Sequence, residues 1–455
     1  MPDTRASASM PRSQWSSRLT FILAATGSAV GLGNIWKFPY ITGEYGGGAF
    51  VLVYLACITL LGIPMLIAEV MIGRSGSASP TNSYRNIGKA DGLNRHWSAA
   101  GSIGVAAGFL VLCFYSVIGG WSMAYLGYAL QGLFAGTDSQ AVSDMFTSLV
   151  SSHLTVIGWH SVFMLSAVLI VGFGVNKGIE RTVSVLMPAM FVLLILLVGY
   201  AATTTGFGAS LSFLFSPDFS KLTSKGILEA LGHAFFTLSL GLAIMLAYGS
   251  YLPKHYSIGK TALTVAFLDT LVALLAGIAI FAVVFSNGLA PDKGPGLVFQ
   301  TLPLSFGQMP FGSVVGALFF FMLLFAAWSS AISITEPSVS SLMERFNTSR
   351  RTAAIIIGLS AWGIGISAAL SFSLWAEFKI LDRTIFDFLD YLTTNILLPL
   401  GCMITALFVG WALPAKRSRA ALAQMSDRTF KLWFLVVRFI TPVLIAIVFI
   451  HNMTA

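Results

Sequence analysis

Residues 27–34 read GSAVGLGN, inside an apolar stretch that extends from residue 18 to residue 40. Three glycines and a terminal Asn34 within eight residues are poor helix formers, so a helix that crosses a membrane here is expected to be interrupted. Residues 239–243, reading SLGLA, interrupt a second apolar stretch five spans later. Exposed backbone inside a membrane is tolerated only where it lines a cavity or binds a ligand. The two interruptions therefore predict an inverted repeat with a central binding site, with close packing around small residues as the alternative.

The composition of the 455-residue chain excludes a soluble fold. Hydrophobic residues make up 56% of the chain and charged residues only 10%, against about 25% charged in a soluble domain. So few charged side chains could not cover the surface of a soluble protein of this size. The same numbers exclude a disordered, fibrous or small secreted chain.

The expected fold class is an all-α polytopic membrane protein. A spanning helix needs about 20 mostly apolar residues, and the chain holds about eleven such stretches. They cover residues 18–40, 48–72, 98–130, 158–174, 180–202, 229–250, 258–286, 311–343, 352–371, 384–412 and 430–450.

The basic residues predict the orientation of these spans. With the N-terminus inside, nineteen Lys and Arg residues fall in inner segments and five in outer loops. This is a strong positive-inside bias, so the N-terminus is expected in the cytoplasm and Ala455 outside. The net charge of +8 is thereby explained by topology. We expect the lipid bilayer as the surroundings of the chain and no nucleic-acid partner.

Three acidic residues lie within apolar runs, where charge is costly and needs a reason. Glu69 follows Pro64 and is expected to accept hydrogen bonds from freed backbone N–H groups. Glu336 precedes Pro337 and is likewise expected to accept hydrogen bonds from freed backbone N–H groups. Asp269 has no neighbouring proline and no cation nearby in sequence, so a bound sodium ion is expected there. A protonated Asp269 is the alternative.

Hydroxyl and amide groups add further oxygen ligands in the same spans. Ser329, Ser330 and Ser333 form a polar face of the eighth span, although such hydroxyls often bond back to a carbonyl instead. Together with Asn34 and Thr237 they could supply oxygens to small cations. The N-termini of half-helices attract a substrate carboxylate. The residues alone therefore predict a sodium-coupled carrier of a small anionic or zwitterionic solute.

Residues 15–39, reading WSSRLTFILAATGSAVGLGNIWKFP, resemble the opening of the neurotransmitter:sodium symporter family. The agreement continues at residues 46–50, 62–74, 234–241 and 248–251. It covers spans one to ten, and the motifs are long enough to be highly specific. The chain is most similar to short bacterial amino-acid transporters of this family that lack a twelfth helix.

The resemblance implies a fold of two inverted five-helix repeats that works by alternating access in the plasma membrane, here a bacterial inner membrane. The repeats would cover residues 18–202 and 229–412, joined by an extracellular loop at 203–228. A cytoplasmic tail (1–17), a cytoplasmic loop (413–429) and an eleventh helix with a short extracellular end (430–455) would complete the chain.

The resemblance also implies two sodium sites. In the first, the substrate carboxylate would be a further ligand, which couples the ion to the solute. The first site would comprise the carbonyl of Ala29, the amide oxygen of Asn34, Thr237 and Asp269. The second would comprise the carbonyls of Gly27, Val30 and Ala326 and the hydroxyls of Ser329 and Ser330.

The substrate position follows from the same resemblance. The carboxylate would meet the backbone of Gly31, Leu32 and Gly33 and the hydroxyl of Tyr115, and the amino group the carbonyls of Ala29 and Phe236, near Thr237 and Ser239. The pocket for the side chain would be lined by Val111, Tyr115, Phe236, Leu242, Ser330, Ala331 and Ile334.

Two comparisons within the family narrow the solute. Gly31 stands where monoamine carriers have an Asp that pairs with an amine, so an amino acid is favoured. The pocket lining carries no charge, so a charged substrate side chain would be unpaired and costly. A neutral, hydrophobic L-amino acid is expected.

Departures from the family pattern predict the ion dependence. Asp269 replaces an Asn, Ala273 replaces the Ser of chloride-dependent members, and His233 replaces a Gln of their chloride site. A fixed negative charge at Asp269 should substitute for chloride, so chloride-independent transport is expected. If Asp269 takes up a proton after sodium leaves, it could carry that proton back across the membrane as proton antiport. Ala243 replaces a Gly, and its methyl group is expected to narrow the pocket.

Gates map onto both sides of the substrate position. The outer gate would be the pair of Lys37 and Asp390, with Tyr115 and Phe236 as a lid. The inner latch would be Arg12, Glu344 and Tyr251, with Trp15 packed beneath. Paired gates favour a carrier over a channel. No enzyme is expected, because the six His residues are scattered, whereas a proton-coupled carrier that uses Asp269 without sodium remains an alternative.

Overall fold

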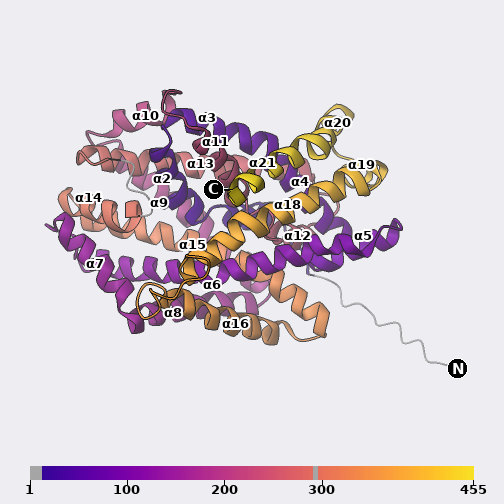
Figure 1. The fold of residues 1–455 in the computed structure, drawn as a ribbon, viewed down its shortest axis with the longest axis horizontal. Coiled ribbons are helices and arrows are strands. Elements are labelled where there is room, and N and C mark those ends of the chain that lie inside the picture. Colours follow the sequence, from indigo (N-terminus) through magenta and orange to yellow (C-terminus); the bar gives the residue numbers. More distant parts are fainter. Residues whose placement is uncertain (1–12, 291–295, 455) are drawn as a thin grey trace.

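The computed structural model describes residues 13–290 and 296–454, and all of its regular elements there are helical (Figure 1). Nine helices in this part of the chain are long and apolar enough to cross a membrane. They are α3 (Gly48–Cys57) continued by α4 (Ile63–Gly76), α6 (Ala99–Leu130), α8 (His153–Gly172), α9 (Arg181–Ala201), α13 (Ile258–Ser286), α15 (Gly312–Phe346), α16 (Arg350–Leu370), α17 (Ile385–Tyr391) continued by α18 (Leu398–Leu407), and α20 (Asp427–Leu435) continued by α21 (Thr441–Thr454).

The two remaining expected spans are broken, as the sequence predicts. In the first, α1 (Arg18–Ala29) and the segment Gly33–Glu44, which includes α2 (Phe38–Glu44), meet at an angle of 50°. The sixth is divided into α11 (Ser224–Thr237) and α12 (Ile244–Ser250), each too short to span alone. Nine whole helices, one bent pair and this divided span together account for the expected number of about eleven.

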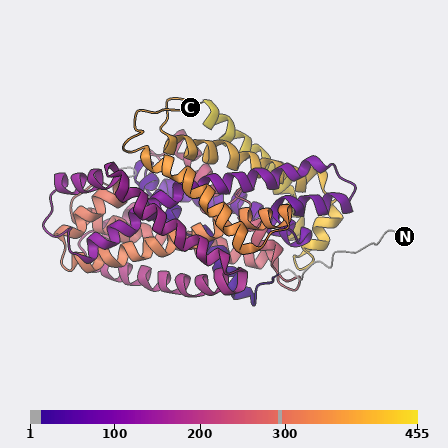
Figure 2. The ribbon, with the colours of Figure 1, turned by 90° about the horizontal axis from the view of Figure 1, so that it is seen from below.

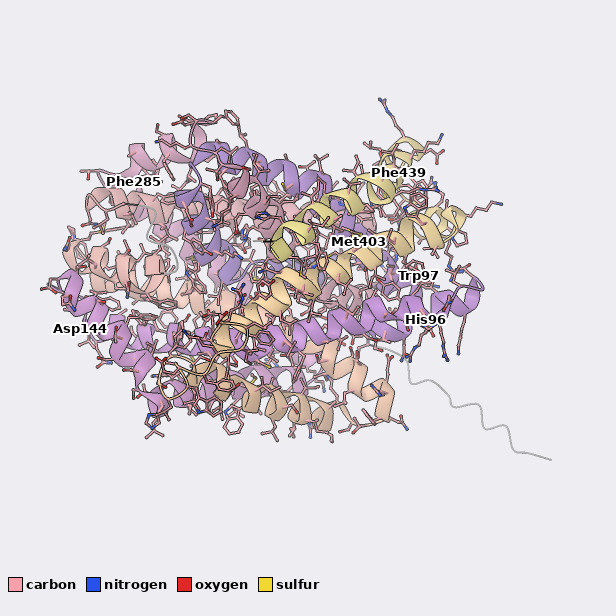
Figure 3. The ribbon with its side chains drawn as sticks, viewed as in Figure 1. His96, Trp97, Asp144, Phe285, Met403 and Phe439 are labelled. Carbon is pink, nitrogen blue, oxygen red and sulfur yellow. The ribbon has the colours of Figure 1, made fainter. Side chains whose placement is uncertain are left out.

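Short helices cap the two ends of the bundle. α5 (Pro80–Ala90) and α19 (Ala415–Ala421) lie at one end of the long axis, and α7 (Ser139–Ser151), α10 (Phe207–Phe215) and α14 (Leu302–Gln308) lie at the other (Figures 1 and 2). The side chains in Figure 3 mark the same ends, with His96 and Trp97 beside α5 and Asp144 and Phe285 at the opposite end. We refer to these as the α5 end and the α7 end.

The broken spans lie inside the bundle. α1 packs against α9, α12, α13 and α15, and α15 makes its most extensive contact with α6. Large apolar side chains such as Leu165, Ile195 and Leu359 are exposed on the outer helices, as expected for a surface in contact with lipid. The non-helical backbone is therefore surrounded by protein, which is the condition under which a membrane tolerates it.

Candidate functional site

The break in the first span is held open by side chains. The Gly31 N–H donates to Oδ1 of Asn34 at 3.1 Å, and the Leu32 N–H donates to the hydroxyl of Tyr115 at 3.4 Å. A Cβ on Gly31 would lie 2.5 Å from Oγ of Ser330 and 3.0 Å from the Tyr115 hydroxyl. Glycine is therefore required here by close packing, and the freed backbone N–H groups face a pocket rather than lipid.

Asp269 collects the polar groups of the first predicted ion site. Its carboxylate accepts a hydrogen bond from Nδ2 of Asn34 at 2.8 Å and one from the Thr237 hydroxyl, which lies 3.0 and 3.1 Å from the two carboxylate oxygens. The hydroxyl of Tyr54 lies 3.5 Å from the second oxygen. Asp269 is fully buried, and no Lys or Arg of the described residues forms an ion pair with it. The described part of the chain thus supplies no compensating cation to this carboxylate.

The second predicted ion site lies where α15 crosses α1. The Ser330 hydroxyl is 3.3 Å from the carbonyl oxygens of Ser28 and Val30 and 3.4 Å from that of Gly27. The Ser329 hydroxyl bonds back to the Ala326 carbonyl at 3.0 Å. All five predicted oxygen donors therefore come from the same α1–α15 contact. The Ser28 carbonyl is an additional oxygen that the sequence did not single out.

The chemistry of both clusters fits a small hard cation. Every predicted donor is an oxygen of a carbonyl, hydroxyl, amide or carboxylate, the type that hard cations such as Na⁺ prefer over nitrogen or sulfur. Within the described residues no group of three or more His, Cys, Asp and Glu could hold a metal ion. The oxygen ligands thus favour a cation of low charge such as Na⁺ over a transition metal.

A small cavity of about 20 Å³ adjoins the α1–α15 cluster, whereas Asn34 and Asp269 of the first cluster do not line it. Its lining includes eleven of the thirteen predicted substrate residues, together with Ser28; Thr237 and Ala331 do not line it. The lining residues are Ser28, Ala29, Gly31, Leu32, Gly33, Val111, Tyr115, Phe236, Ser239, Leu242, Ser330 and Ile334. No charged side chain is among them, so the cavity is suited to a neutral side chain.

A wider vestibule of about 400 Å³ lies next to this cavity, and Tyr115 and Phe236 line both. Leu32 and Gly33 also line both, so the backbone of the break in the first span and these two aromatic rings form the boundary between the vestibule and the cavity. Lys37 and Asp390 both line the vestibule but do not form an ion pair. The Lys37 ammonium instead lies 5.3 Å from the centre of the Phe236 ring.

Toward the α5 end, the chain before α1 closes over the site. Trp15 is 3% exposed, and its indole N–H donates to the Tyr248 carbonyl at 3.0 Å. Its ring packs edge-on against Tyr248 and Tyr251, and its backbone N–H donates to the Tyr251 carbonyl at 3.1 Å. Trp15 is thus packed beneath the predicted latch.

Among the other latch residues, Glu344 contacts the start of α5, and its predicted contact with Arg12 stays a prediction. Both carboxylate oxygens of Glu344 accept from the Ser79 N–H, at 2.8 and 2.9 Å, and one accepts from Nδ2 of Asn82 at 2.8 Å. Arg12 lies outside the described residues. Glu344 therefore ties the end of α15 to the start of α5.

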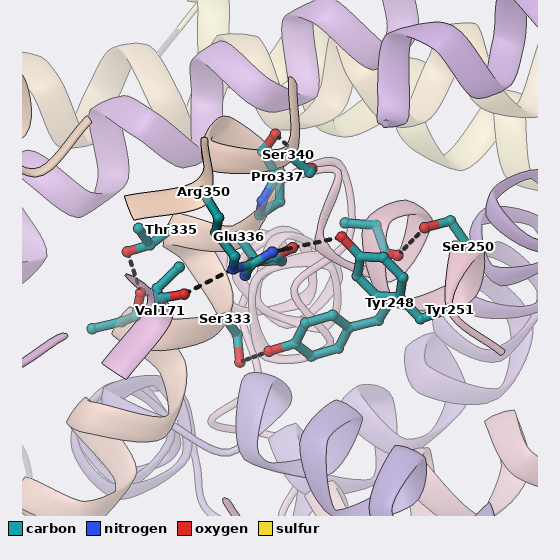
Figure 4. A network of polar contacts seen from close by, with 12 residues as sticks. Val171, Tyr248, Ser250, Tyr251, Ser333, Thr335, Glu336, Pro337, Ser340 and Arg350 are labelled. Atoms are coloured by element: carbon teal, nitrogen blue, oxygen red, sulfur yellow. Dashed lines mark hydrogen bonds and ion pairs between the residues drawn. The ribbon is translucent and has the colours of Figure 1, made fainter. Parts of the chain in front are cut away.

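Glu336 forms a network that the sequence did not predict. It accepts a hydrogen bond from the Tyr251 hydroxyl at 2.6 Å and pairs with the Arg350 guanidinium, whose Nε donates to the Val171 carbonyl at 2.9 Å (Figure 4). The expectation that Glu336 accepts backbone N–H groups beside Pro337 was wrong, because a fully buried carboxylate is compensated better by a cation. The sequence signal for this pair was an acid in an apolar run, Glu336, followed by the basic start of the next helix at Arg350.

The break in the sixth span confirms one prediction and corrects another. Glu69 accepts a hydrogen bond from the Gly241 N–H at 2.8 Å, as expected of an acceptor for freed backbone. Ala243 does not line the small cavity, and a Cβ on Gly104 would lie 2.9 Å from its methyl group. The expected narrowing of the pocket was wrong, because the backbone at Ala243, with φ of 60°, directs the methyl group toward α6.

Broken helices around a buried, oxygen-rich centre, with a vestibule on one side and a closed face on the other, define a membrane carrier. The model of the sodium:neurotransmitter symporter family matches residues 12–142 and 139–455. The chain therefore belongs to the sodium:neurotransmitter symporter family.

Individual relatives agree over nearly the whole length. The sodium-dependent transporter YhdH of Bacillus subtilis is 40% identical over 445 residues, which cover 96% of this chain and 97% of the relative. A sodium-dependent transporter of Haemophilus influenzae is 34% identical over 450 residues, covering 97% and 98%. The crystal structure of MhsT in complex with L-phenylalanine is 44% identical, with a TM-score of 0.89 over 97% of this chain and 100% of that chain. The chain is thus a sodium-dependent transporter of this family.

Proposed function

We propose that the chain is a sodium-coupled symporter that takes up a neutral, hydrophobic L-amino acid by alternating access. The observation that supports this proposal most directly is an uncharged cavity at the break in the first span, beside the oxygens around Ser330. A carboxylate bound at this break would also lie near Asn34, which contacts both Gly31 and Asp269. The structure of MhsT with L-phenylalanine supports an amino acid of this class.

The exposed backbone of the first span would bind the substrate carboxylate. The Gly31 and Leu32 N–H groups lie at the cavity, where they donate to Asn34 Oδ1 and to the Tyr115 hydroxyl, and a bound carboxylate would replace these acceptors. No room exists at Gly31 for a larger side chain, so an acidic partner for an amine cannot be placed there. The lining supplies no charge for a substrate side chain, and burying an unpaired charge is costly.

The two oxygen clusters would hold two sodium ions. Asn34, Thr237, Asp269 and the Ala29 carbonyl would hold one ion, and the α1–α15 contact around Ser330 the other. The substrate carboxylate would complete the first site, which couples ion binding to solute binding. Because Asp269 brings its own negative charge, we propose that transport is independent of chloride. A proton on Asp269 would neutralise that charge during the return step.

Alternating access would use the closures on either side of the cavity. Tyr115 and Phe236 would separate it from the vestibule, which Lys37 and Asp390 line without forming an ion pair. Trp15 and the Glu336–Arg350 pair close the α5 end. The predominance of basic residues at the α5 end supports a cytoplasmic N-terminus in the plasma membrane.

A ligand screen tests the substrate proposal. The purified full-length protein would be heated with each of the twenty amino acids, in sodium and in choline. We expect hydrophobic amino acids to raise the melting temperature only in sodium. Stabilisation by charged amino acids alone, or by hydrophobic ones equally well in choline, would contradict the proposal.

A further inference from the structure

A second cavity, of about 910 Å³, opens at the α5 end between α5, α6, α15 and α16. It shares no lining residue with the small cavity or with the vestibule. α6 and α15 contact each other and both contact α5 and α16. This groove is therefore separate from the transport site.

The mouth of the groove carries two arginines that form no ion pair with any described residue. Arg85 and Arg345 line it and are exposed, and neither forms an ion pair within the part of the chain that the structure describes. Nη1 of Arg85 lies 3.3 Å from Oδ1 of Asn82. The one carboxylate in the lining, Glu344, already accepts from the Ser79 N–H and Asn82. An anion at the mouth would thus meet two guanidinium groups that form no ion pair with a described residue.

The walls behind this mouth are apolar and continue onto the outer surface of the bundle. Val105 and Phe109 of α6 face Ile356 and Ile357 of α16 across the groove. Ile356 is 46% exposed, so the wall is continuous with the surface that contacts lipid. A hydrocarbon chain could therefore enter from the bilayer without crossing a polar barrier.

The floor of the groove adds polar groups that lack partners. Ser338 and Ser341 of α15 line it, and neither hydroxyl has a hydrogen-bond partner among the described residues. Ser338 is 97% buried, since only 3% of its surface is exposed. A buried hydroxyl without a partner is costly, and a ligand with acceptor oxygens would relieve that cost.

We propose that this groove binds an anionic phospholipid of the leaflet at the α5 end. The headgroup phosphate is held at the mouth by Arg85 and Arg345, and an acyl chain lies along Val105, Phe109 and Ile356. Arginine suits a phosphate because its planar guanidinium donates two parallel hydrogen bonds. Basic pockets between membrane helices on the cytoplasmic side select anionic lipids over zwitterionic ones.

The test compares lipid binding by the delipidated full-length protein with that of a charge-matched pair of variants. Arg85→Gln/Arg345→Gln removes two charges at the groove, and Lys416→Gln/Lys431→Gln removes two exposed charges elsewhere on the chain. We expect dioleoyl phosphatidylglycerol to bind the first variant about 30-fold more weakly than wild type, from the loss of two basic contacts. The second variant should keep wild-type affinity. Equal weakening of both variants, or of neither, would overturn the proposal.

Two further binding measurements identify the class of ligand. Ala106→Trp would fill the groove from the exposed face of α6, and it should abolish phosphatidylglycerol binding while sodium-dependent amino-acid binding is retained. Glycerol phosphate at the same concentration should not bind measurably, because it lacks the acyl chains. Binding of glycerol phosphate as tight as that of the lipid, or of phosphatidylcholine as tight as that of phosphatidylglycerol, would refute an anionic phospholipid site.

Discussion

Replacing Asp269 with Asn preserves shape but removes the carboxylate from the proposed first sodium site. The side chain is fully buried and hydrogen-bonded to Asn34 and Thr237, so solvent cannot supply a substitute charge. A unit charge about 4 Å from an ion contributes about 4 kcal/mol at an effective dielectric constant of about 20. The Asn oxygen keeps part of this interaction, and contacts to charged groups carry about 1.5–3 kcal/mol each. We expect sodium binding to weaken by about 2–3 kcal/mol, or about 30- to 150-fold.

Sodium titration of the purified protein, followed by thermal shift at saturating L-phenylalanine, measures this change. Asp390→Asn is the matched control, because it removes a carboxylate that lines the vestibule and lies outside both ion clusters. The control should keep the sodium affinity of the wild type. If Asp269→Asn bound sodium as tightly as wild type, the assignment of Asp269 as an ion ligand would be refuted.

Three other perturbations test the remaining parts of the account. Arg350→Met leaves Glu336 buried without its cation and should cost about 3–5 kcal/mol of stability in thermal unfolding. The double variant Glu336→Gln/Arg350→Met should regain most of this stability. An Arg350→Met variant as stable as wild type would contradict the buried pair. Gly104→Ala places a Cβ 2.9 Å from that of Ala243 and should cost about 1–3 kcal/mol, whereas Gly158→Ala, with nothing within 4 Å, should not destabilise the protein. Replacing chloride with gluconate at constant sodium should leave amino-acid uptake unchanged. A loss of uptake in gluconate would show that Asp269 does not substitute for chloride.

The sequence predicted the features that are encoded locally. Glycines 27, 31 and 33 with Asn34 marked the break in the first span, and Glu69 was recognised as an acceptor because an acid beside Pro64 in an apolar helix has few other uses. Both depend on a few neighbouring residues and the absence of water in a bilayer. Such arguments need no knowledge of how the helices pack.

Features that depend on packing were missed or misjudged. The basic pattern assigns Arg350 to the residues that set the topology, because its pairing with Glu336 depends on how the start of α16 folds back onto the interior of α15. The methyl group of Ala243 was assigned to the pocket, since its direction depends on a positive φ that the sequence does not reveal. The Ser28 carbonyl was overlooked because backbone oxygens carry no sequence signature.

Replacement of sodium by choline at constant pH tests the central claim most directly. The protein would be reconstituted into liposomes, and uptake of radiolabelled L-phenylalanine would be followed with an inward sodium gradient. We predict saturable, concentrative uptake in sodium and none above protein-free liposomes in choline. Unchanged uptake in choline would contradict sodium coupling and would favour a proton-coupled carrier built around Asp269.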